Sequence, residues 1–159
     1  MDATTHDILT AADRLGEWEF PSDDNVDLWP VIDSLAAELE KITGYKLDVD
    51  RNVQDASFMT DIGLLDDRYY NRAAGTGVIY YIFSFRFSNF ARLFTLHGDE
   101  WEQRYEELGL ARCIAVIRSR GFVYVAADAL ESPYDGINGT NNPIAGSPLT
   151  WWIRFFDYT

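Results

Sequence analysis

The sequence has very few cysteines and histidines, the side chains that most often bind zinc and that commonly act as a catalytic nucleophile or base. It contains a single cysteine, Cys113, and two histidines, His6 and His97. One cysteine cannot form an internal disulfide, and its aliphatic neighbours predict a buried and unreactive thiol. A zinc site would need His6, His97 and Cys113 to converge, and none of the three has ligand spacing to another. We therefore expect neither a metal nor any other cofactor.

Lysine and long hydrophobic runs are also scarce. Lys41 and Lys46 are the only lysines among 13 basic residues, and the formal net charge is −13. Nucleic-acid binding and anionic-membrane binding both require a basic surface, so this charge argues against either partner. No window approaches 18 uninterrupted apolar residues, and residues 1–7 have neither a positively charged leader nor an apolar run. These absences predict a cytoplasmic protein.

Acidic residues, by contrast, are abundant and are concentrated in the first part of the chain. Residues 1–67 carry 17 Asp and Glu against four Lys and Arg, whereas residues 68–159 carry nine of each sign. Most arginines therefore lie in the second part, and Arg forms partly desolvated ion pairs more readily than Lys. We expect several of these arginines to pair with acidic residues at the surface of a sheet.

The pattern of apolar and polar residues predicts an α+β fold, in which a mostly antiparallel sheet has two or three helices packed on one face. A chain of 159 residues can bury one sizeable core, so we interpret residues 1–159 as a single domain. Helices are expected over residues 4–16, 28–43 and 99–108. Strands are expected over residues 45–50, 56–62, 81–88, 90–96, 113–118, 122–127 and 151–158.

The helix over residues 28–43 has the clearest pattern. Six apolar residues fall within an arc of about 100° at helical spacing. They are Leu28, Val31, Ile32, Leu35, Leu39 and Ile42. Asp27 is a suitable N-cap, and Gly44 suits the position after the last turn. Asp33 and Glu40 point away from the apolar arc, so this helix is expected to bury one face and present carboxylates on the other.

The segment after residue 98 allows two interpretations. Residues 113–118 and 122–127 are rich in β-branched and aromatic residues, and the Ser119-Arg120-Gly121 turn between them indicates a hairpin. A single long helix over residues 99–118 is the alternative. Residues 151–158 are apolar on both faces apart from Arg154, which is typical of a terminal strand inside a sheet.

An aromatic ladder marks the strand over residues 81–88. Tyr81, Phe83, Phe85 and Phe87 occupy every second position, and the opposite side is mostly polar. This alternation is typical of an antiparallel sheet with one covered face. The aromatic face forms the main core beneath the helices or, alternatively, lines a ligand pocket.

Two local motifs have features of functional sites. Residues 48–59 begin like a calcium-binding loop, but Val53 stands where Gly is required and Met59 where Glu is required, so we interpret them as a solvated acidic turn. His97 is followed by a glycine and two acidic residues and has the chemistry of a general acid or base. A surface ion pair or a helix cap explains the same residues.

The acidic residues themselves give the leading functional hypothesis. Runs of charge are commonly solvated surface, but clustered carboxylates also accelerate encounter with basic partners. The candidate partner-binding residues are Asp23, Asp24, Asp27, Trp29, Asp33, Glu40, Asp48, Asp50, Asp66 and Asp67. We predict a non-enzymatic protein that neutralises a basic protein partner, as an immunity or inhibitor protein does with a bacterial toxin acting on nucleic acid. Such toxins need a positive cleft to hold phosphates.

Two other functions stay open. One is a ligand-binding or hydrolytic domain with an aromatic-lined pocket that has His97 or a buried carboxylate at its mouth. The other is a structural or assembly protein that forms a homodimer through edge strands, with Trp151 and Trp152 at the seam.

Overall fold

The computed structural model describes residues 1–13, 28–50, 59–71, 74–138 and 148–156. The helices in these ranges are α1 (Ala3–Ala12), α2 (Trp29–Thr43), α3 (Leu110–Ser119), α4 (Ala127–Leu130) and α5 (Trp151–Phe156). The strands are β1 (Asp48–Asp50), β2 (Met59–Leu65), β3 (Tyr70–Asn71), β4 (Thr76–Gly77), β5 (Tyr81–Ser88), β6 (Leu93–His97) and β7 (Val123–Tyr124).

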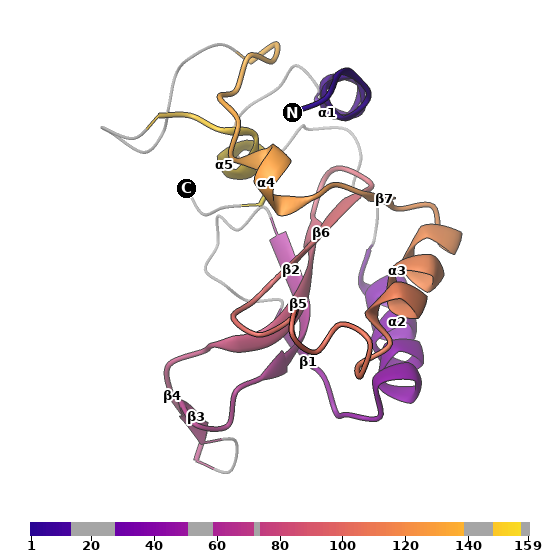
Figure 1. The fold of residues 1–159 in the computed structure, drawn as a ribbon, viewed down its shortest axis with the longest axis vertical. Helices are drawn as coiled ribbons and strands as arrows, with labels where there is room; N and C mark the ends of the chain where they lie inside the picture. Colours follow the sequence, from indigo (N-terminus) through magenta and orange to yellow (C-terminus); the bar gives the residue numbers. More distant parts are fainter. Residues whose placement is uncertain (14–27, 51–58, 72–73, 139–147, 157–159) are drawn as a thin grey trace.

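Five strands form one sheet in the order β1-β2-β5-β6-β7, and β3 pairs only with β4. Every neighbouring pair is antiparallel except β6 and β7, which run parallel. The predicted α+β fold with a mostly antiparallel sheet is therefore confirmed (Figure 1). The assignment of the whole chain to one domain stays a prediction.

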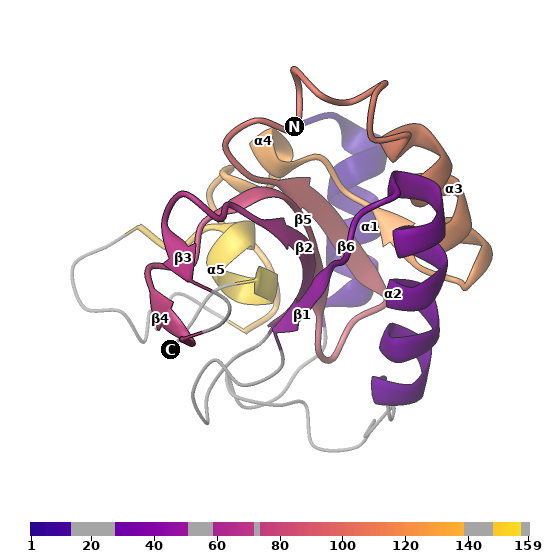
Figure 2. The ribbon, with the colours of Figure 1, turned by 90° about the horizontal axis from the view of Figure 1, so that it is seen from below.

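Helices α2 and α3 cover one face of the sheet (Figure 2). The phenylalanines of the β5 ladder, Phe83, Phe85 and Phe87, are fully buried on this face. They belong to the same apolar cluster as residues from both helices. The three phenylalanines of the ladder are thus core, as the first interpretation predicted, whereas Tyr81 is not part of this cluster and lines a pocket on the other face. Cys113 of α3 is buried here too, and burial raises the pKa of its thiol to about 11, which keeps it unreactive.

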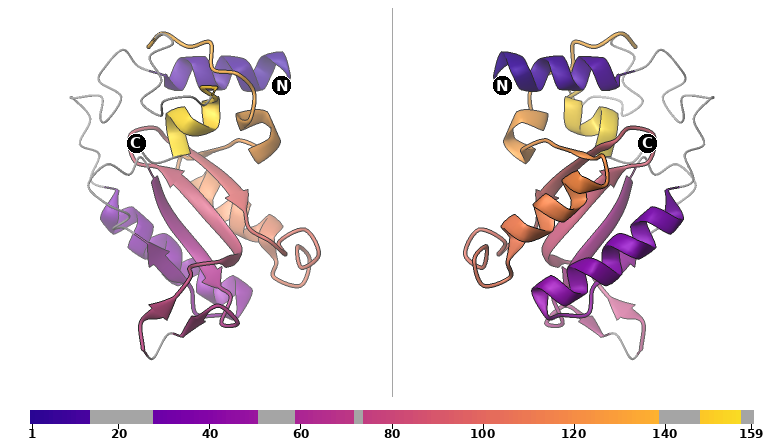
Figure 3. Two further views of the ribbon diagram at one scale, coloured as in Figure 1. Left: turned by 90° about the vertical axis from the view of Figure 1, so that its left-hand side faces the viewer. Right: turned by 90° about the vertical axis from the view of Figure 1, so that its right-hand side faces the viewer.

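The opposite face of the sheet is partly covered by α5, which packs against β5 (Figures 2 and 3). A second apolar cluster joins α1, α4 and α5 to the loop after β5 and the start of β6. Its buried members are Leu9, Phe90, Ala91, Leu93, Val125, Leu130, Tyr134, Trp151, Phe155 and Phe156. The first helix and the last described helix therefore share one core.

A buried ion pair lies within this second cluster. Asp13, just after α1, accepts a hydrogen bond of 2.8 Å from Nε of Arg154 on α5, and both side chains are fully buried. Asp13 also accepts hydrogen bonds from the Tyr134 hydroxyl at 2.5 Å and from the side-chain amide of Asn138 at 2.9 Å. The Arg154 guanidinium lies 4.6 Å from the ring centroid of Phe90. Buried charges need such partners, so this network fixes α1 to α5.

The predicted hairpin over residues 113–127 is wrong, because its first arm is helix α3. The buried residues Leu110, Cys113 and Ile117 repeat at helical spacing, so the same apolar run fits a helix that packs on the sheet. The alternative helix over 99–118 was right only in its second half. Residues 101–109 form successive turns, so the separate helix predicted over residues 99–108 is also wrong. A parallel β6–β7 pair requires a crossover, and α3 supplies it.

The predicted C-terminal strand is also wrong, because residues 151–156 form helix α5. Trp151, Arg154 and Phe155 repeat at three- and four-residue spacing and are all buried. An apolar run covered on both sides cannot be assigned to strand or helix by periodicity alone. Trp151 is fully buried within the chain. It therefore does not lie at an edge strand, as the predicted dimer seam required.

Smaller differences concern the ends of elements. Helix α1 is capped by Asp2, whose carboxylate accepts a hydrogen bond from the amide of Thr5 at 2.9 Å, rather than by one of the threonines. Helix α2 ends at Gly44 in the left-handed conformation, as predicted. The predicted cap Asp27 lies outside the described residues. Strand β2 is buried along its whole length, Met59–Leu65, and residues 56–58 of the predicted strand lie outside the described residues.

Breaking the Asp13–Arg154 pair is expected to destabilise the fold strongly. Asp13→Asn leaves the guanidinium of Arg154 buried without its countercharge, which costs about 3–5 kcal/mol of unfolding free energy. Urea unfolding followed by tryptophan fluorescence measures this loss. Asp7→Asn, an exposed change on α1, serves as the control and should stay within about 0.5 kcal/mol of the unaltered protein. A similarly small effect of Asp13→Asn would contradict the role given to the pair.

Candidate functional site

The second face of the sheet carries a row of polar side chains. Strand pairing places Asp61 opposite Arg86 and opposite Asp50, and places Ser84 opposite His97. Directly opposed residues in antiparallel strands project from the same face. Four strands thus bring acidic and basic groups together on the side of the sheet away from α2 and α3.

Asp61 is the centre of this row. Its carboxylate accepts hydrogen bonds from the Ser84 hydroxyl at 2.9 Å and from Nη2 of Arg86 at 2.8 Å. Its Oδ1 also lies 3.2 Å from Nε2 of His97. The Asp61 side chain is only 2% exposed. Arg86 and Asp61 form one arginine–carboxylate pair of the kind expected on the sheet, although it is largely buried.

The ionisation of Asp61 follows from these contacts. Burial opposes the charged form, but the hydrogen bond with His97 and the charge of Arg86 outweigh it and lower the pKa of Asp61 to about 2. Asp61 is therefore ionised at any physiological pH, and its negative charge is balanced inside the protein.

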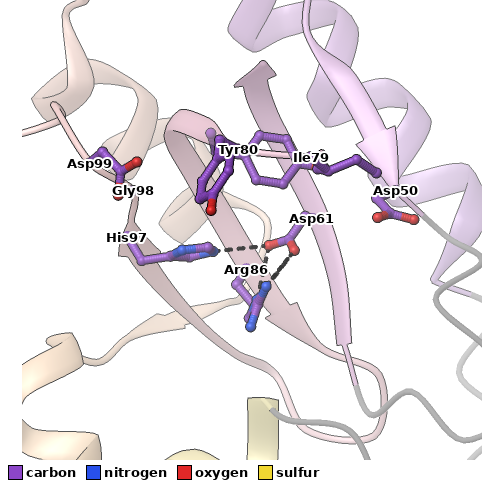
Figure 4. A pocket seen from close by; sticks show the side chains of 9 residues that line it. Asp50, Asp61, Ile79, Tyr80, Arg86, His97, Gly98 and Asp99 are labelled. Atoms are coloured by element: carbon purple, nitrogen blue, oxygen red, sulfur yellow. Dashed lines mark hydrogen bonds and ion pairs between the residues drawn. The ribbon is translucent and has the colours of Figure 1, made fainter. Parts of the chain in front are cut away.

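A pocket of about 270 Å³ opens beside this network. Its lining residues come from β1, β2, β5, β6 and the segments next to β5 and β6. They are Asp50, Asp61, Ile79, Tyr80, Tyr81, Arg86, His97, Gly98 and Asp99. Figure 4 shows Asp61 between His97 and Arg86, with Asp50 and Asp99 on opposite sides of them. Three carboxylates thus line the pocket against one guanidinium and one imidazole.

Two glycines allow the backbone and side chains around the pocket to approach closely. A Cβ at Gly63 would lie 2.5 Å from Cδ1 of Tyr81, so only glycine permits the Tyr81 ring to lie on this face of β2. Gly98 has a φ of +130°, and a Cβ there would lie 2.7 Å from the carbonyl oxygen of Ile82. Burial, with the charges of Asp61 and Asp50, raises the pKa of Tyr81, so its hydroxyl stays neutral.

Helix α5 packs against the polar row and contacts Arg86 and His97. The Arg86 guanidinium donates a hydrogen bond from Nη1 to the carbonyl oxygen of Phe156 at 3.2 Å and lies 5.4 Å from the ring centroid of Trp152. The Trp152 ring also meets His97 edge-on at a centroid distance of 5.9 Å. Helix α5 therefore packs against both the Arg86 guanidinium and the His97 ring.

An exposed apolar surface borders the other side of the pocket, next to the β3–β4 hairpin. It consists of Tyr69, Val78, Ile79 and Tyr80, called the apolar strip below, and each residue is between 45% and 59% exposed. The strip is continuous, because the Tyr69 and Tyr80 rings lie 5.0 Å apart and the amide of Val78 donates to the carbonyl oxygen of Tyr69 at 3.1 Å. Ile79 and Tyr80 also line the pocket. Contiguous apolar surface of this kind marks interaction sites.

The candidate partner-binding residues do not all lie on one side of the sheet. Asp23, Asp24 and Asp27 lie outside the described residues. Trp29 and Asp33 are exposed on α2, which covers the aromatic face. The remaining candidates are Glu40 on the same helix, Asp48 and Asp50 on β1, and Asp66 and Asp67 in the turn after β2.

Two of these candidates are held in local ion pairs. Glu40 pairs with Lys46 at 2.8 Å and accepts the amide of Leu47 at 3.0 Å, which ties the end of α2 to β1. Asp66 is buried and pairs with Arg68, whose guanidinium also reaches Glu100 at 2.6 Å. Asp67 is exposed, and Asp48 and Asp50 are half-buried on the pocket side. Asp50 is the candidate that lines the pocket directly.

Only some of the residues that line the pocket could be identified from sequence patterns. His97 and a buried carboxylate at a pocket mouth belonged to one of the open alternatives, and Arg86 fell on the polar side of the predicted ladder. Ile79 and Tyr80 were missed, because they lie between a predicted polar loop and the ladder. Their exposure depends on the β3–β4 hairpin, whose two-residue strands leave no clear periodicity.

Within the described ranges, no group of three or more His, Cys, Asp and Glu side chains is arranged to hold a metal ion. No described helix is both long enough and apolar enough to cross a bilayer. The pocket lining contains no serine, threonine, cysteine or lysine. Its chemistry is that of an acidic, aromatic-walled binding site.

Comparisons with known proteins add no family to this description. No protein-family model, no curated protein and no solved structure matches the chain.

The pKa of Asp61 predicts how stability depends on pH. Because that pKa lies below the usual 3.8, ionised Asp61 stabilises the folded state above pH 3.8, and this contribution is lost as the pH falls toward 2. Asp61→Asn mimics the protonated form. The quantity to follow is the difference in unfolding free energy between the unaltered protein and the Asp61→Asn variant. This difference should become smaller by on the order of 2 kcal/mol as the pH is lowered from 5 to 2.5.

Urea titrations across this pH range measure the effect. Asp7→Asn, an exposed change on α1, is the matched control and should show no such change in the difference from the unaltered protein. A constant difference between the unaltered protein and Asp61→Asn at all pH values would contradict a depressed pKa at Asp61.

Proposed function

We propose that this protein binds and neutralises a cationic protein partner through the pocket and the adjoining apolar strip. The observation that carries the proposal is their adjacency: Ile79 and Tyr80 belong both to the exposed strip and to a pocket lined by Asp50 and Asp99. An apolar anchor beside charged groups is the usual anatomy of a protein interface.

The charge of the surface selects the kind of partner. Asp48 and Asp50 on β1 and Asp99 after β6 all lie around the pocket side of the sheet. Their field attracts a basic protein and raises its association rate. A second copy of this chain is a poorer partner, because a two-fold contact would place the same carboxylates against each other.

A toxin that degrades nucleic acid is the partner class that fits best. Such an enzyme needs a positive cleft to bind phosphates, and an acidic protein can cover that cleft. In this proposal the protein acts as an immunity or inhibitor protein. The strip supplies apolar contact area and the carboxylates supply orientation and speed.

Capture of a partner at two salt concentrations tests the proposal. The immobilised protein should retain a basic protein at low ionic strength and lose it at about 0.5 M salt, because screening removes the steering field. Asp50→Lys with Asp99→Lys should weaken binding of that protein by about tenfold or more. If the captured protein is a nuclease, its activity should fall on adding the unaltered protein and not on adding the double variant.

Asp7→Lys with Asp33→Lys is the control, since it changes the net charge equally at exposed positions on α1 and α2. Equal loss of binding in both double variants would show that only net charge matters and would overturn the proposed site. Failure to capture a basic protein at low salt would overturn the proposed function, as would self-association of this chain through the strip.

The Asp61–His97 contact supports a second candidate, a hydrolytic domain. A carboxylate that orients a histidine is a common arrangement for a general base, and His97 lines the pocket. In this candidate the histidine activates a water molecule for attack on the substrate. Hydrolysis of a chromogenic ester or phosphodiester that is lost in His97→Gln would support this candidate over the first.

A further inference from the structure

We propose that an extended segment of the basic partner binds as an added strand along the open edge of the chain at Ile79, between β4 and β5. This inference rests on the proposed function and deepens it, because it states how the partner contacts the apolar strip. Main-chain hydrogen bonds hold the segment in place, and its side chains contact the strip and the acidic surface beside it.

The main-chain groups of Ile79 are unpaired. Among the described residues, none donates a hydrogen bond to the Ile79 carbonyl oxygen or accepts one from its N–H. The Val78 amide donates to the carbonyl oxygen of Tyr69 at 3.1 Å. The Tyr80 carbonyl oxygen accepts a hydrogen bond from the amide of Asp66 at 2.8 Å. Successive residues of an extended chain direct these groups to opposite sides, so those of Ile79 point away from β3.

This open edge continues the side of β5 on which β6 pairs. Strand β6 ends at His97, and the chain turns away at Gly98, whose φ is +130°. The Asp99 amide still donates to the carbonyl oxygen of Tyr81 at 3.1 Å. Ile79 lies two residues before Tyr81 and therefore faces the same side. A strand added at Ile79 thus extends the sheet in line with β6.

The edge lacks the features that usually protect an exposed strand. Residues 74–81 contain neither a charged residue nor a proline. Val78, Ile79 and Tyr80 are 59%, 50% and 45% exposed, and the β3–β4 hairpin projects beyond the rest of the sheet (Figure 1). Native proteins usually place lysine, proline or other charged residues on such an edge, because an unprotected edge pairs with other chains. Pairing is therefore the use that this composition favours.

The charge beside the edge selects a basic segment. Asp99 is exposed, and within the described part of the chain its carboxylate forms no ion pair. The neighbouring Glu100 is instead paired with Arg68 at 2.6 Å. Ile79 and Asp99 both line the pocket, and directly opposed residues of paired strands project from the same face. A basic side chain opposite Ile79 therefore lies on the face that carries Asp99, whereas an acidic one is repelled there.

Hydrogen exchange with a peptide probe tests the added strand without the partner. The probe is a hexapeptide of alternating valine and arginine with blocked ends, which is basic and half β-branched. At saturation, exchange of the Ile79 amide should slow by about tenfold or more, because its N–H becomes hydrogen-bonded. The Tyr80 amide faces the β3 side and should exchange as before. Protection of both amides, or of neither, would overturn the inference.

Two altered peptides separate main-chain pairing from charge. The same peptide methylated on every backbone nitrogen keeps its side chains and its charge but has no N–H to donate. A hexapeptide of alternating valine and glutamate keeps the pattern with the opposite charge. Each should bind at least about tenfold more weakly than the valine–arginine peptide. Equal binding of the methylated peptide would show that side chains suffice, and equal binding of the acidic peptide would remove the preference for a basic segment; either result overturns the inference.

Two substitutions at the edge test the same contact from this chain. Ile79→Pro removes the N–H that the added strand needs and should abolish binding of the valine–arginine peptide. Ile79→Val keeps the N–H and an apolar side chain and should bind within about twofold of the unaltered protein. Unchanged binding to the proline variant would overturn the inference. If urea unfolding shows that this variant does not fold, the exchange of the Ile79 amide in the unaltered protein decides.

This outcome is separable from that of the capture experiment. If a basic protein is captured but the Ile79 amide stays unprotected in that complex, the proposed function stands and the added strand fails. If the peptide protects Ile79 but no basic protein is captured, the added strand stands and the proposed function fails. A dimer of this chain that Ile79→Pro dissociates would assign the edge to a second copy and overturn the inference.

Discussion

In the middle of the sheet, Asp61 faces Arg86 across β2 and β5, and both charges lie largely out of water. A carboxylate can be buried there only because donors replace its hydration, and Arg86, Ser84 and His97 do so. Arg86 also donates to the end of α5. The same ion pair therefore neutralises the polar face, holds the C-terminal helix against it and forms the base of the pocket.

The two faces of the sheet consequently have different tasks. The face with Phe83, Phe85 and Phe87 is filled by α2 and α3 and contributes burial of apolar area. Among the described elements, α5 packs against the other face at β5, and the pocket lies beside it, next to the β3–β4 hairpin. The proposed binding function uses this second face of the sheet, where the pocket lies.

The sequence predicted the parts of the fold in which local pattern and tertiary environment agree. Helix α2 and strand β5 each have one apolar and one polar side, and both were found. Residues 113–118 and 151–156 were assigned to strands because they are apolar in succession, and the distinction from helix depends on what packs around them. The candidate site was half predicted, since the pairing of Asp61, Arg86 and His97 requires strand register, which no single segment encodes.

The cluster that joins α1 to α5 has a consequence for folding during synthesis. Leu9 and Asp13 find their partners, Trp151 and Arg154, only when nearly all of this chain has been made. A ten-residue helix is marginal in water on its own, so α1 gains lasting structure late. The segment from α2 to α3 can pack earlier, through contacts closer in sequence. While the chain grows on the ribosome, the apolar side of α1 therefore lacks the residues that cover it in the folded protein, and such exposed apolar surface is what chaperones protect.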